Sequence, residues 1–171
     1  MLTQEEKDAI AVELDSGLPS YADAVHALDA IQKSRGWISE KSLRDVAEHL
    51  GMTPAELDGV ATFYNRIYRS PVGRHVVLLC DSVSCWVMGY ENLFRHLLDR
   101  LGITAFGETT KDGLFTLLPS ACLGACDHAP AMMIDRKLYG DLTLQRIDEI
   151  VDRYKEAAGA SNGQAAGQVQ R

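Results

Sequence analysis

The first seventy residues alternate between short amphipathic stretches and residues that start or end helices. The clearest stretch repeats apolar residues at the spacing of one helical face: Tyr21, Ala24, Val25, Leu28 and Ile31. Gly36 follows, where glycine commonly ends a helix, and Ser39 and Gly51 bracket another apolar stripe. Thr3–Glu6 and Thr53–Glu56 each have the residues of a capping box. Residues 1–70 therefore predict a small helical bundle.

The pattern changes after residue 70. Mainly apolar runs of strand length occupy residues 75–80, 114–119 and 131–134, and a shorter run follows them. Two amphipathic helical stripes accompany these runs: Leu93, Leu97, Leu98 and Leu101, and then Leu144, Ile147, Ile150 and Val151. The order β-α-β-β-α predicts a compact α/β sandwich over residues 71–157. The low-complexity run beyond it predicts a disordered tail over residues 158–171.

Composition and charge narrow the class of protein. The chain has 171 residues, of which 46% are hydrophobic, and a formal net charge of −7. An acidic chain is a poor partner for nucleic acid, because phosphate binding needs a basic face. The apolar runs are too short to span a bilayer, so we expect no direct membrane insertion. The acidic N-terminal segment is unlike a signal peptide, which predicts a cytoplasmic protein.

The chemistry of the chain is concentrated in four cysteines. They form two close pairs, Cys80-x4-Cys85 and Cys122-x3-Cys126, each flanked by small residues. The first pair is expected on a loop just after the first predicted strand, and the second on a loop just before the third. Four thiolates from two short loops are the donor set of an iron–sulfur cluster or a zinc ion. The cysteines are therefore the candidate ligands of a metal centre.

Spacing alone leaves the occupant of these cysteines open. Zinc loops usually pair their cysteines as C-x2-C, whereas gaps of four and three residues suit the larger two-iron cluster. Two disulfides are a further alternative, but disulfides are rare in chains that stay in the cytosol. The sequence has no C-x-x-C redox motif and no glycine-rich nucleotide-binding motif. The spacing therefore favours a [2Fe–2S] cluster over zinc. The missing glycine-rich motif predicts no nucleotide site in this chain, and we expect no catalytic residue in it.

His128 is the histidine nearest to the cysteines in the sequence. It lies two residues after Cys126, so it is a possible fifth ligand or a proton-linked neighbour of the site. Four thiolates already complete a ligand set, which argues against a role for the imidazole as ligand.

Several runs along the chain resemble one known family. The segments that carry the resemblance are residues 36–37, 59–64, 80–86, 122–134 and 139–143. They are similar to those of the E subunit of bacterial NADH-quinone oxidoreductase (respiratory complex I), whose members are thioredoxin-like [2Fe–2S] ferredoxins. The similarity runs from about residue 3 to residue 155, and the cysteine runs are its most specific part.

The resemblance implies a fold and a ligand set. It implies a thioredoxin-like α/β domain over residues 71–157, preceded by a helical docking domain over residues 1–70. It also implies a cis peptide bond between Ala129 and Pro130. The ligands that it implies for one [2Fe–2S] cluster are Cys80, Cys85, Cys122 and Cys126.

The resemblance also implies a function within a larger assembly. Such a chain exchanges an electron with the FMN of a neighbouring subunit that oxidises NADH, and it contacts an iron–sulfur subunit of the same complex. It is cytoplasmic, or peripheral on the cytoplasmic face of the inner membrane through the complex. Two alternatives stay open: the homologous small subunit of a soluble NAD-dependent formate dehydrogenase or NAD-reducing hydrogenase, and a zinc-stabilised scaffold.

Overall fold

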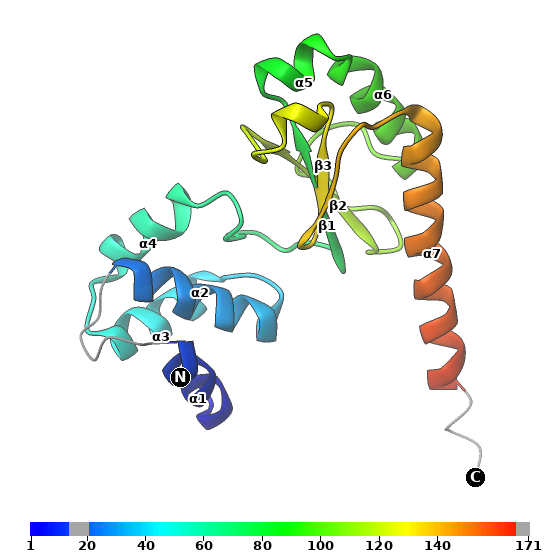
Figure 1. Ribbon diagram of the computed structural model, residues 1–171. Helices are drawn as coiled ribbons and strands as arrows, with labels where there is room; N and C mark the ends of the chain where they lie inside the picture. The colour runs from blue at the N-terminus through cyan, green and yellow to red at the C-terminus, as the bar shows by residue number, and fades with distance from the viewer. Residues whose placement is uncertain (14–20, 167–171) are drawn as a thin grey trace. The chain divides into compact units, whose positions relative to one another are not determined.

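The computed structural model describes residues 1–13 and 21–166, and it divides the chain into two compact units. The first unit comprises residues 1–72 and the second begins at residue 73, where the sequence predicted a boundary after residue 70. Figure 1 shows the helical first unit and the mixed second unit, each of which is described by itself. None of the described helices combines the length and the apolar character that crossing a membrane requires.

The described residues of the first unit form four helices. Their bounds are α1 Gln4–Glu13, α2 Tyr21–Arg35, α3 Glu40–Leu50 and α4 Pro54–Phe63. The predicted signals form as expected: Ser39 Oγ accepts a hydrogen bond from the Ser42 N–H at 3.0 Å, and Gly51 ends α3 with φ 67°. Both capping boxes are present, at Thr3–Glu6 and Thr53–Glu56. Apolar side chains from all four helices form one core, which includes Ile10, Leu28, Ile31, Leu43, Val46 and Leu57.

A largely buried ion pair joins α1 to α2 in this unit. The Glu6 carboxylate accepts hydrogen bonds from Arg35 Nε at 2.6 Å and from Arg35 Nη2 at 2.8 Å. Arg35 Nη1 also donates to Ser42 Oγ at 3.0 Å. The hydrogen bonds from Arg35 lower the pKa of Glu6 from 4.5 to about 2, although burial of the carboxylate opposes the change. The pair therefore contributes to stability only while Glu6 is ionised.

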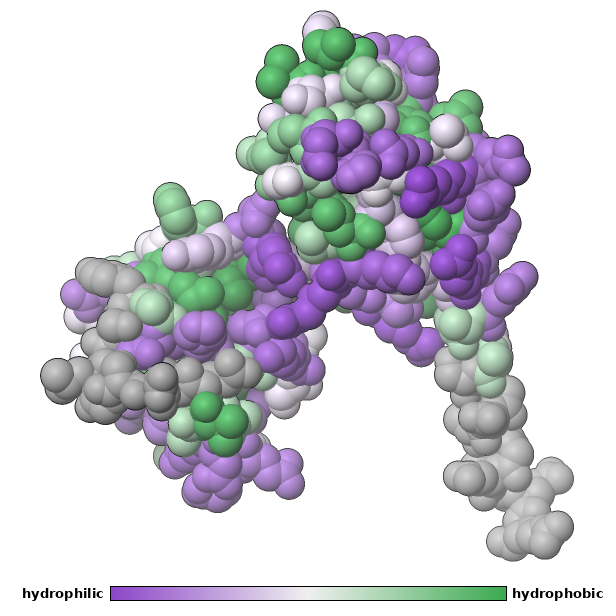
Figure 2. Space-filling model, in the orientation of Figure 1, coloured by the Kyte–Doolittle hydropathy of each residue, from purple (hydrophilic) through white to green (hydrophobic). Residues whose placement is uncertain are grey.

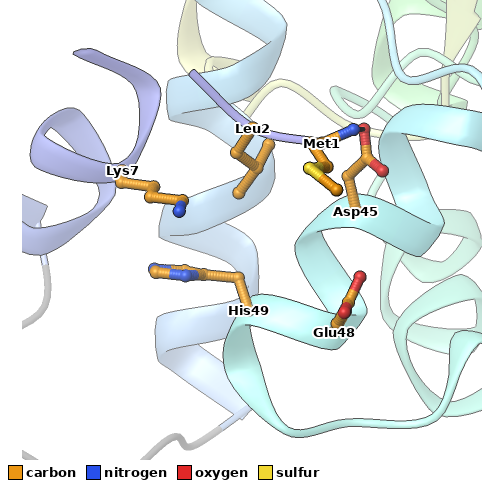
Figure 3. Close-up of a pocket in the computed structure, with 6 residues that line it drawn as sticks. All are labelled: Met1, Leu2, Lys7, Asp45, Glu48 and His49. Atoms are coloured by element: carbon orange, nitrogen blue, oxygen red, sulfur yellow. Dashed lines mark hydrogen bonds and ion pairs between the residues drawn. The ribbon is translucent and has the colours of Figure 1, made fainter. Parts of the chain in front are cut away.

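The N-terminus is held close to this ion pair. The α-amino group of Met1 lies 2.9 Å from Asp45 Oδ2, and this contact lowers the pKa of Asp45. Figure 3 shows the adjacent pocket of about 280 Å³, which lies between the N-terminal segment, α1 and α3. Its lining residues are Met1, Leu2, Lys7, Asp45, Glu48 and His49. The pocket contains no cysteine, so it is separate from the candidate metal ligands.

The second unit is a four-stranded sheet with helices. Its elements are β1 His75–Cys80, α5 Val83–Val87, α6 Tyr90–Leu101, β2 Phe115–Ser120, the 3-10 helix η1 Cys126–His128, β3 Met132–Ile134, β4 Lys137–Tyr139 and α7 Leu144–Ala166. The strand order is β2-β1-β3-β4, with β1 parallel to β2 and antiparallel to β3. Because β1 is central and buried, its sequence is an unbroken apolar run.

Helices α6 and α7 pack on one face of this sheet (Figure 1). Alternate strand residues, such as Val77 and Leu79 of β1, share a core with Leu97 of α6 and Ile147 of α7. Cys80, one residue after Leu79, therefore belongs to the opposite face, where it lies in a separate apolar cluster. The core of the second unit thus holds the sheet rigid without using the cysteines.

The structure differs from the sequence-based prediction at two places. The loop predicted after the strand over residues 75–80 is instead partly helical: Cys80 ends β1, as that strand implied, but Cys85 lies inside helix α5. The tail was predicted to be disordered over residues 158–171, but α7 continues through Ala166, and residues 167–171 lie outside the described part of the chain. Alanine-rich sequence favours helix even where complexity is low, and Ala158 packs against the core.

We predict that Glu6→Gln destabilises the first unit by about 2 kcal/mol at pH 7, because Arg35 loses its charged partner. A lowered pKa means that the stabilisation is present above the unfolded pKa, near 4.5, and is lost as the pH falls through about 2. As the pH falls from about 4.5 to about 2, the variant should therefore lose less stability than the natural chain. Urea unfolding followed by the fluorescence of Trp37, in a Trp86→Phe background, measures this unit.

Glu5→Gln is the matched control, because Glu5 is exposed one residue away. Equal unfolding midpoints for the Glu5 and Glu6 variants at pH 7 would contradict the assigned role of the ion pair.

Candidate metal centre

All four cysteines are free thiols, so the two-disulfide alternative is not the arrangement in the structure. Cys80 and Cys85 are buried, with 3% and 2% of their surfaces exposed, whereas Cys122 and Cys126 are exposed. Cys122 lies in the loop after β2, and Cys126 is the first residue of η1. The site therefore has one buried pair of sulfurs and one that faces solvent.

The fold brings the two pairs to the same end of the sheet. Cys80 and Cys85 share an apolar cluster with Ala125 and Ala131. Ala125 directly precedes Cys126, and Ala131 ends the segment that follows it. Antiparallel pairing of β3 with β1 brings this segment to Cys80, whose N–H donates to the Ala131 carbonyl at 3.1 Å. Within the exposed pair, the Cys122 and Cys126 sulfurs are 3.9 Å apart. In the part of the chain that the structure describes, no three Cys, His, Asp or Glu side chains are arranged to hold a single metal ion.

Polar groups close to the cysteines favour negative charge on the sulfurs. The Gly124 N–H donates to Cys122 Sγ at 3.3 Å, in a turn where Gly124 has φ 77°. The Ala131 backbone acts to lower the pKa of Cys85, and the Ser84 hydroxyl acts to lower that of Cys126. Such donors stabilise negative charge on sulfur, because they favour the thiolate over the thiol. The arrangement is suited to four sulfurs that carry charge together.

Without a bound cation, Cys85 and Cys126 favour the neutral thiol. Burial, with a further contribution from neighbouring Cys80, raises the pKa of Cys85 from 9.0 to about 11, although the Ala131 backbone opposes this. The pKa of Cys126 is also raised, mainly by Cys122 and slightly by Cys80 of the other pair. Each pair therefore influences the charge state of the other. A cation would release protons on binding, because it requires thiolates.

His128 does not turn its ring toward the sulfurs. Its Nδ1 atom is 3.0 Å from Asp141 Oδ2, and its Nε2 atom is 3.5 Å from Asp127 Oδ2. Both ring nitrogens are therefore engaged with carboxylates, which agrees with four cysteines as the full ligand set. The peptide bond between Ala129 and Pro130 is cis, as the resemblance implied.

Helix α5 is the part of the site that sequence analysis missed. It is a five-residue helix, too short to show an apolar period, and its N-cap residue, Ser82, makes no side-chain capping bond. The helix carries Ser84 and Cys85 on the inside and leaves large apolar side chains exposed around it (Figure 2). These are Val83, Trp86, Val87 and Met88.

Comparison with known proteins agrees with this geometry. Residues 16–155 match the sequence pattern of the family described as thioredoxin-like [2Fe-2S] ferredoxin. The chain belongs to this family. The E subunit of the NADH-quinone oxidoreductase of Escherichia coli strain K12 is 44% identical over 154 residues, which are 90% of this chain and 92% of that one. The corresponding E subunit of Pseudomonas aeruginosa is 40% identical over the same shares of the two chains. The family resemblance drawn from the cysteine runs is therefore confirmed.

A structural likeness extends to a different enzyme. A crystal structure of NAD+-reducing [NiFe]-hydrogenase in the H2-reduced state superposes with a TM-score of 0.63 and 26% identity. The match covers 75% of this chain and 22% of the hydrogenase chain. Three quarters of this chain therefore share their fold with part of that hydrogenase chain.

We predict that Cys122 and Cys126 of the reduced, metal-free chain are alkylated well before Cys80 and Cys85. The two groups differ in burial, and a pKa raised from 9.0 to about 11 also lowers the thiolate fraction of Cys85 about 100-fold at pH 8. Mass-spectrometric peptide mapping of a time course with iodoacetamide measures each rate.

The urea-unfolded chain is the control, in which the four rates should converge. Rates for Cys85 and Cys122 that agree within a factor of about two in the folded chain would contradict the described burial.

Proposed function

We propose that Cys80, Cys85, Cys122 and Cys126 hold one [2Fe–2S] cluster, and that the chain is an electron-transfer subunit of an NADH:quinone oxidoreductase. The observation that carries the proposal is the convergence of two pairs of free thiols at one end of the sheet. It occurs in a ferredoxin-family chain that is 44% identical to the E subunit of such a complex.

The donor set fits the proposed group. Two pairs of free thiols lie at one end of the sheet, and the Gly124 N–H donates to Cys122 Sγ at 3.3 Å. When bound, a [2Fe–2S] cluster supplies a centre that takes up and releases one electron at a time. The gaps of four and three residues within the pairs also favour a cluster over zinc.

The residues around the site have different roles in holding the cluster and in setting its charge environment. Cys80 and Cys85 hold one side in a water-excluded cluster, whereas Cys122 and Cys126 leave the other side open toward solvent. Backbone and hydroxyl donors offset the negative charge of the thiolates. Asp81 and Asp127, both exposed next to ligand positions, add negative charge that disfavours uptake of an electron and so lowers the reduction potential.

The helical unit has a surface suited to docking. Phe63 is 80% exposed and Tyr64 45% exposed, and their rings meet edge to face at 5.1 Å. Large exposed aromatic residues are typical anchors of protein interfaces. They border a groove of about 430 Å³ whose lining is Ala55, Glu56, Gly59, Val60, Phe63 and Tyr64. We infer that this surface contacts the FMN- and NADH-binding subunit of the complex.

The remaining assembly follows from the same proposal. An iron–sulfur subunit of the complex is a second partner. The chain then functions in the cytoplasm, or at the cytoplasmic face of the inner membrane, where the complex holds it.

The small subunit of a soluble NAD-linked enzyme is the second candidate. The hydrogenase likeness favours it over a formate dehydrogenase, although the relatives with higher identity are E subunits of NADH-quinone oxidoreductases. Affinity purification from the native cell, followed by identification of the co-purifying subunits, distinguishes the candidates. Recovery of hydrogenase subunits in place of quinone-reductase subunits would replace the main proposal.

We predict two irons and two acid-labile sulfides per chain after anaerobic purification, because two iron ions and two sulfides complete a four-thiolate set. Chemical iron and sulfide assays measure both. Stoichiometric zinc without sulfide would instead establish the scaffold alternative.

Cysteine variants extend this prediction to the ligands. Cys→Ala at any of the four positions should abolish the normal visible and EPR spectra, since the sequence has no spare cysteine. His128→Ala is the control and should keep both spectra. A normal spectrum from any one cysteine variant would remove that residue from the ligand set.

We predict that Phe63→Lys weakens binding to the flavin-bearing subunit at least about 10-fold, because it places a charge in the proposed interface. Val12→Lys is a matched control: Val12 is 87% exposed and, like Phe63, lies at the C-terminal end of a helix of the same unit. Surface plasmon resonance with cluster-loaded chains measures both affinities. Equal affinities for the two variants would reject the docking role of this groove.

A further inference from the structure

The turn between β4 and α7 is hydrogen-bonded to the segment that follows Cys126. The Asp141 N–H donates to the His128 carbonyl at 2.7 Å, and the Leu142 N–H donates to the Pro130 carbonyl at 3.1 Å. The Asp141 carboxylate is also 3.0 Å from His128 Nδ1. Two backbone bonds and one side-chain contact thus join the turn to the loop.

Gly140 lets the turn approach this closely. A Cβ atom at position 140 would lie 2.5 Å from His128 Cβ and 2.8 Å from the His128 carbonyl oxygen. Neither distance is sterically tolerable, and the carbonyl belongs to a backbone that is itself hydrogen-bonded. Glycine is therefore required here by lack of space, because the backbone of Gly140 does not have a positive φ.

Asp141 adopts the backbone conformation that allows its hydrogen bond to the His128 carbonyl. Its φ is 48°, in the left-handed region, which is unfavourable for most residues but tolerated by Asp and Asn. This conformation directs the Asp141 N–H at the backbone of His128 while its carboxylate meets the imidazole ring.

The segment held by this turn connects two residues of the candidate site. Residues 128–130 lie between Cys126, a proposed ligand, and Ala131, which shares an apolar cluster with Cys80 and Cys85. The Ala131 carbonyl accepts a hydrogen bond from the Cys80 N–H at 3.1 Å. A shift of residues 128–130 would therefore displace a ligand of one pair and the backbone hydrogen bond that holds the other.

We propose that Gly140 and Asp141 are positioning residues for the [2Fe–2S] site, which fix residues 126–131 so that Cys126 and Ala131 keep their places beside Cys80 and Cys85. The inference rests on the proposed cluster-binding function. It assigns to a turn outside both cysteine segments an influence on how firmly the cluster is held and on its reduction potential.

The test uses the full cluster-loaded chain and three variants of the turn. Gly140→Ala should lose its cluster about 10-fold faster during exposure to a chelator, and the remaining cluster should show altered EPR g values and a shifted midpoint potential. Asp141→Ala should shift the same signals, because alanine tolerates the left-handed backbone conformation of this position poorly. Asp141→Asn keeps the conformation and an oxygen acceptor, so it should restore the natural values.

Gly159→Ala is the matched control, because a Cβ atom there meets nothing within 4 Å. If Gly140→Ala does not fold, Asp141→Ala and Asp141→Asn decide the question. Loaded turn variants with natural EPR spectra, potentials and rates of cluster loss would overturn this inference alone. Absence of iron and sulfide from the natural chain would overturn the proposed function, and this inference with it.

Discussion

The antiparallel pairing of β1 with β3 is the interaction on which the candidate site depends. Val77, Leu78 and Leu79 pair with Ile134, Met133 and Met132, and the ladder continues into the hydrogen bond from Cys80 to Ala131. Each backbone bond contributes only about 1 kcal/mol, but their register decides which residues meet. A slip of one residue would turn Cys80 to the face that α6 and α7 cover. Together with the parallel pairing of β1 and β2, which places Ser120 opposite Cys80, the β1–β3 pairing brings the two cysteine pairs together despite their separation in sequence.

The same pairing creates an electrostatic contrast across the site. Cys80 and Cys85 lie in an apolar cluster where an isolated thiolate is unfavourable, and burial accordingly raises the pKa of Cys85. Charge can accumulate there only if a cation and oriented N–H groups compensate it. The backbone of Ala131 acts to lower the pKa of Cys85, from the end of the segment that also carries Cys126. The strand pairing therefore supplies both the geometry and part of the charge compensation.

Sequence analysis succeeded where a local pattern determines the structure. The capping boxes formed because donor and acceptor are three residues apart, and β1 was evident because burial on both faces requires an unbroken apolar run. Helix α5 was missed because five residues contain too little of a period, and the helical extension of α7 was missed because composition indicated disorder. Features that depend on distant neighbours were inaccessible to periodicity. The strand order β2-β1-β3-β4 does not follow from apolar spacing, and the need for glycine at position 140 depends on His128, on another loop.

The separation of core and site within the second unit bears on how a cluster could be acquired. Leu97, Phe115 and Ile147 are fully buried in a core on one face of the sheet, whereas Cys80 and Cys85 lie in a smaller cluster of their own. Burial of large apolar side chains contributes roughly 1.5–3 kcal/mol each, so this core supports the sheet independently of any metal. In small metal-dependent domains, by contrast, the metal supplies the folding energy. In this chain the sheet can hold the buried pair in place first, while the exposed pair, Cys122 and Cys126, leaves a side through which iron and sulfide can enter.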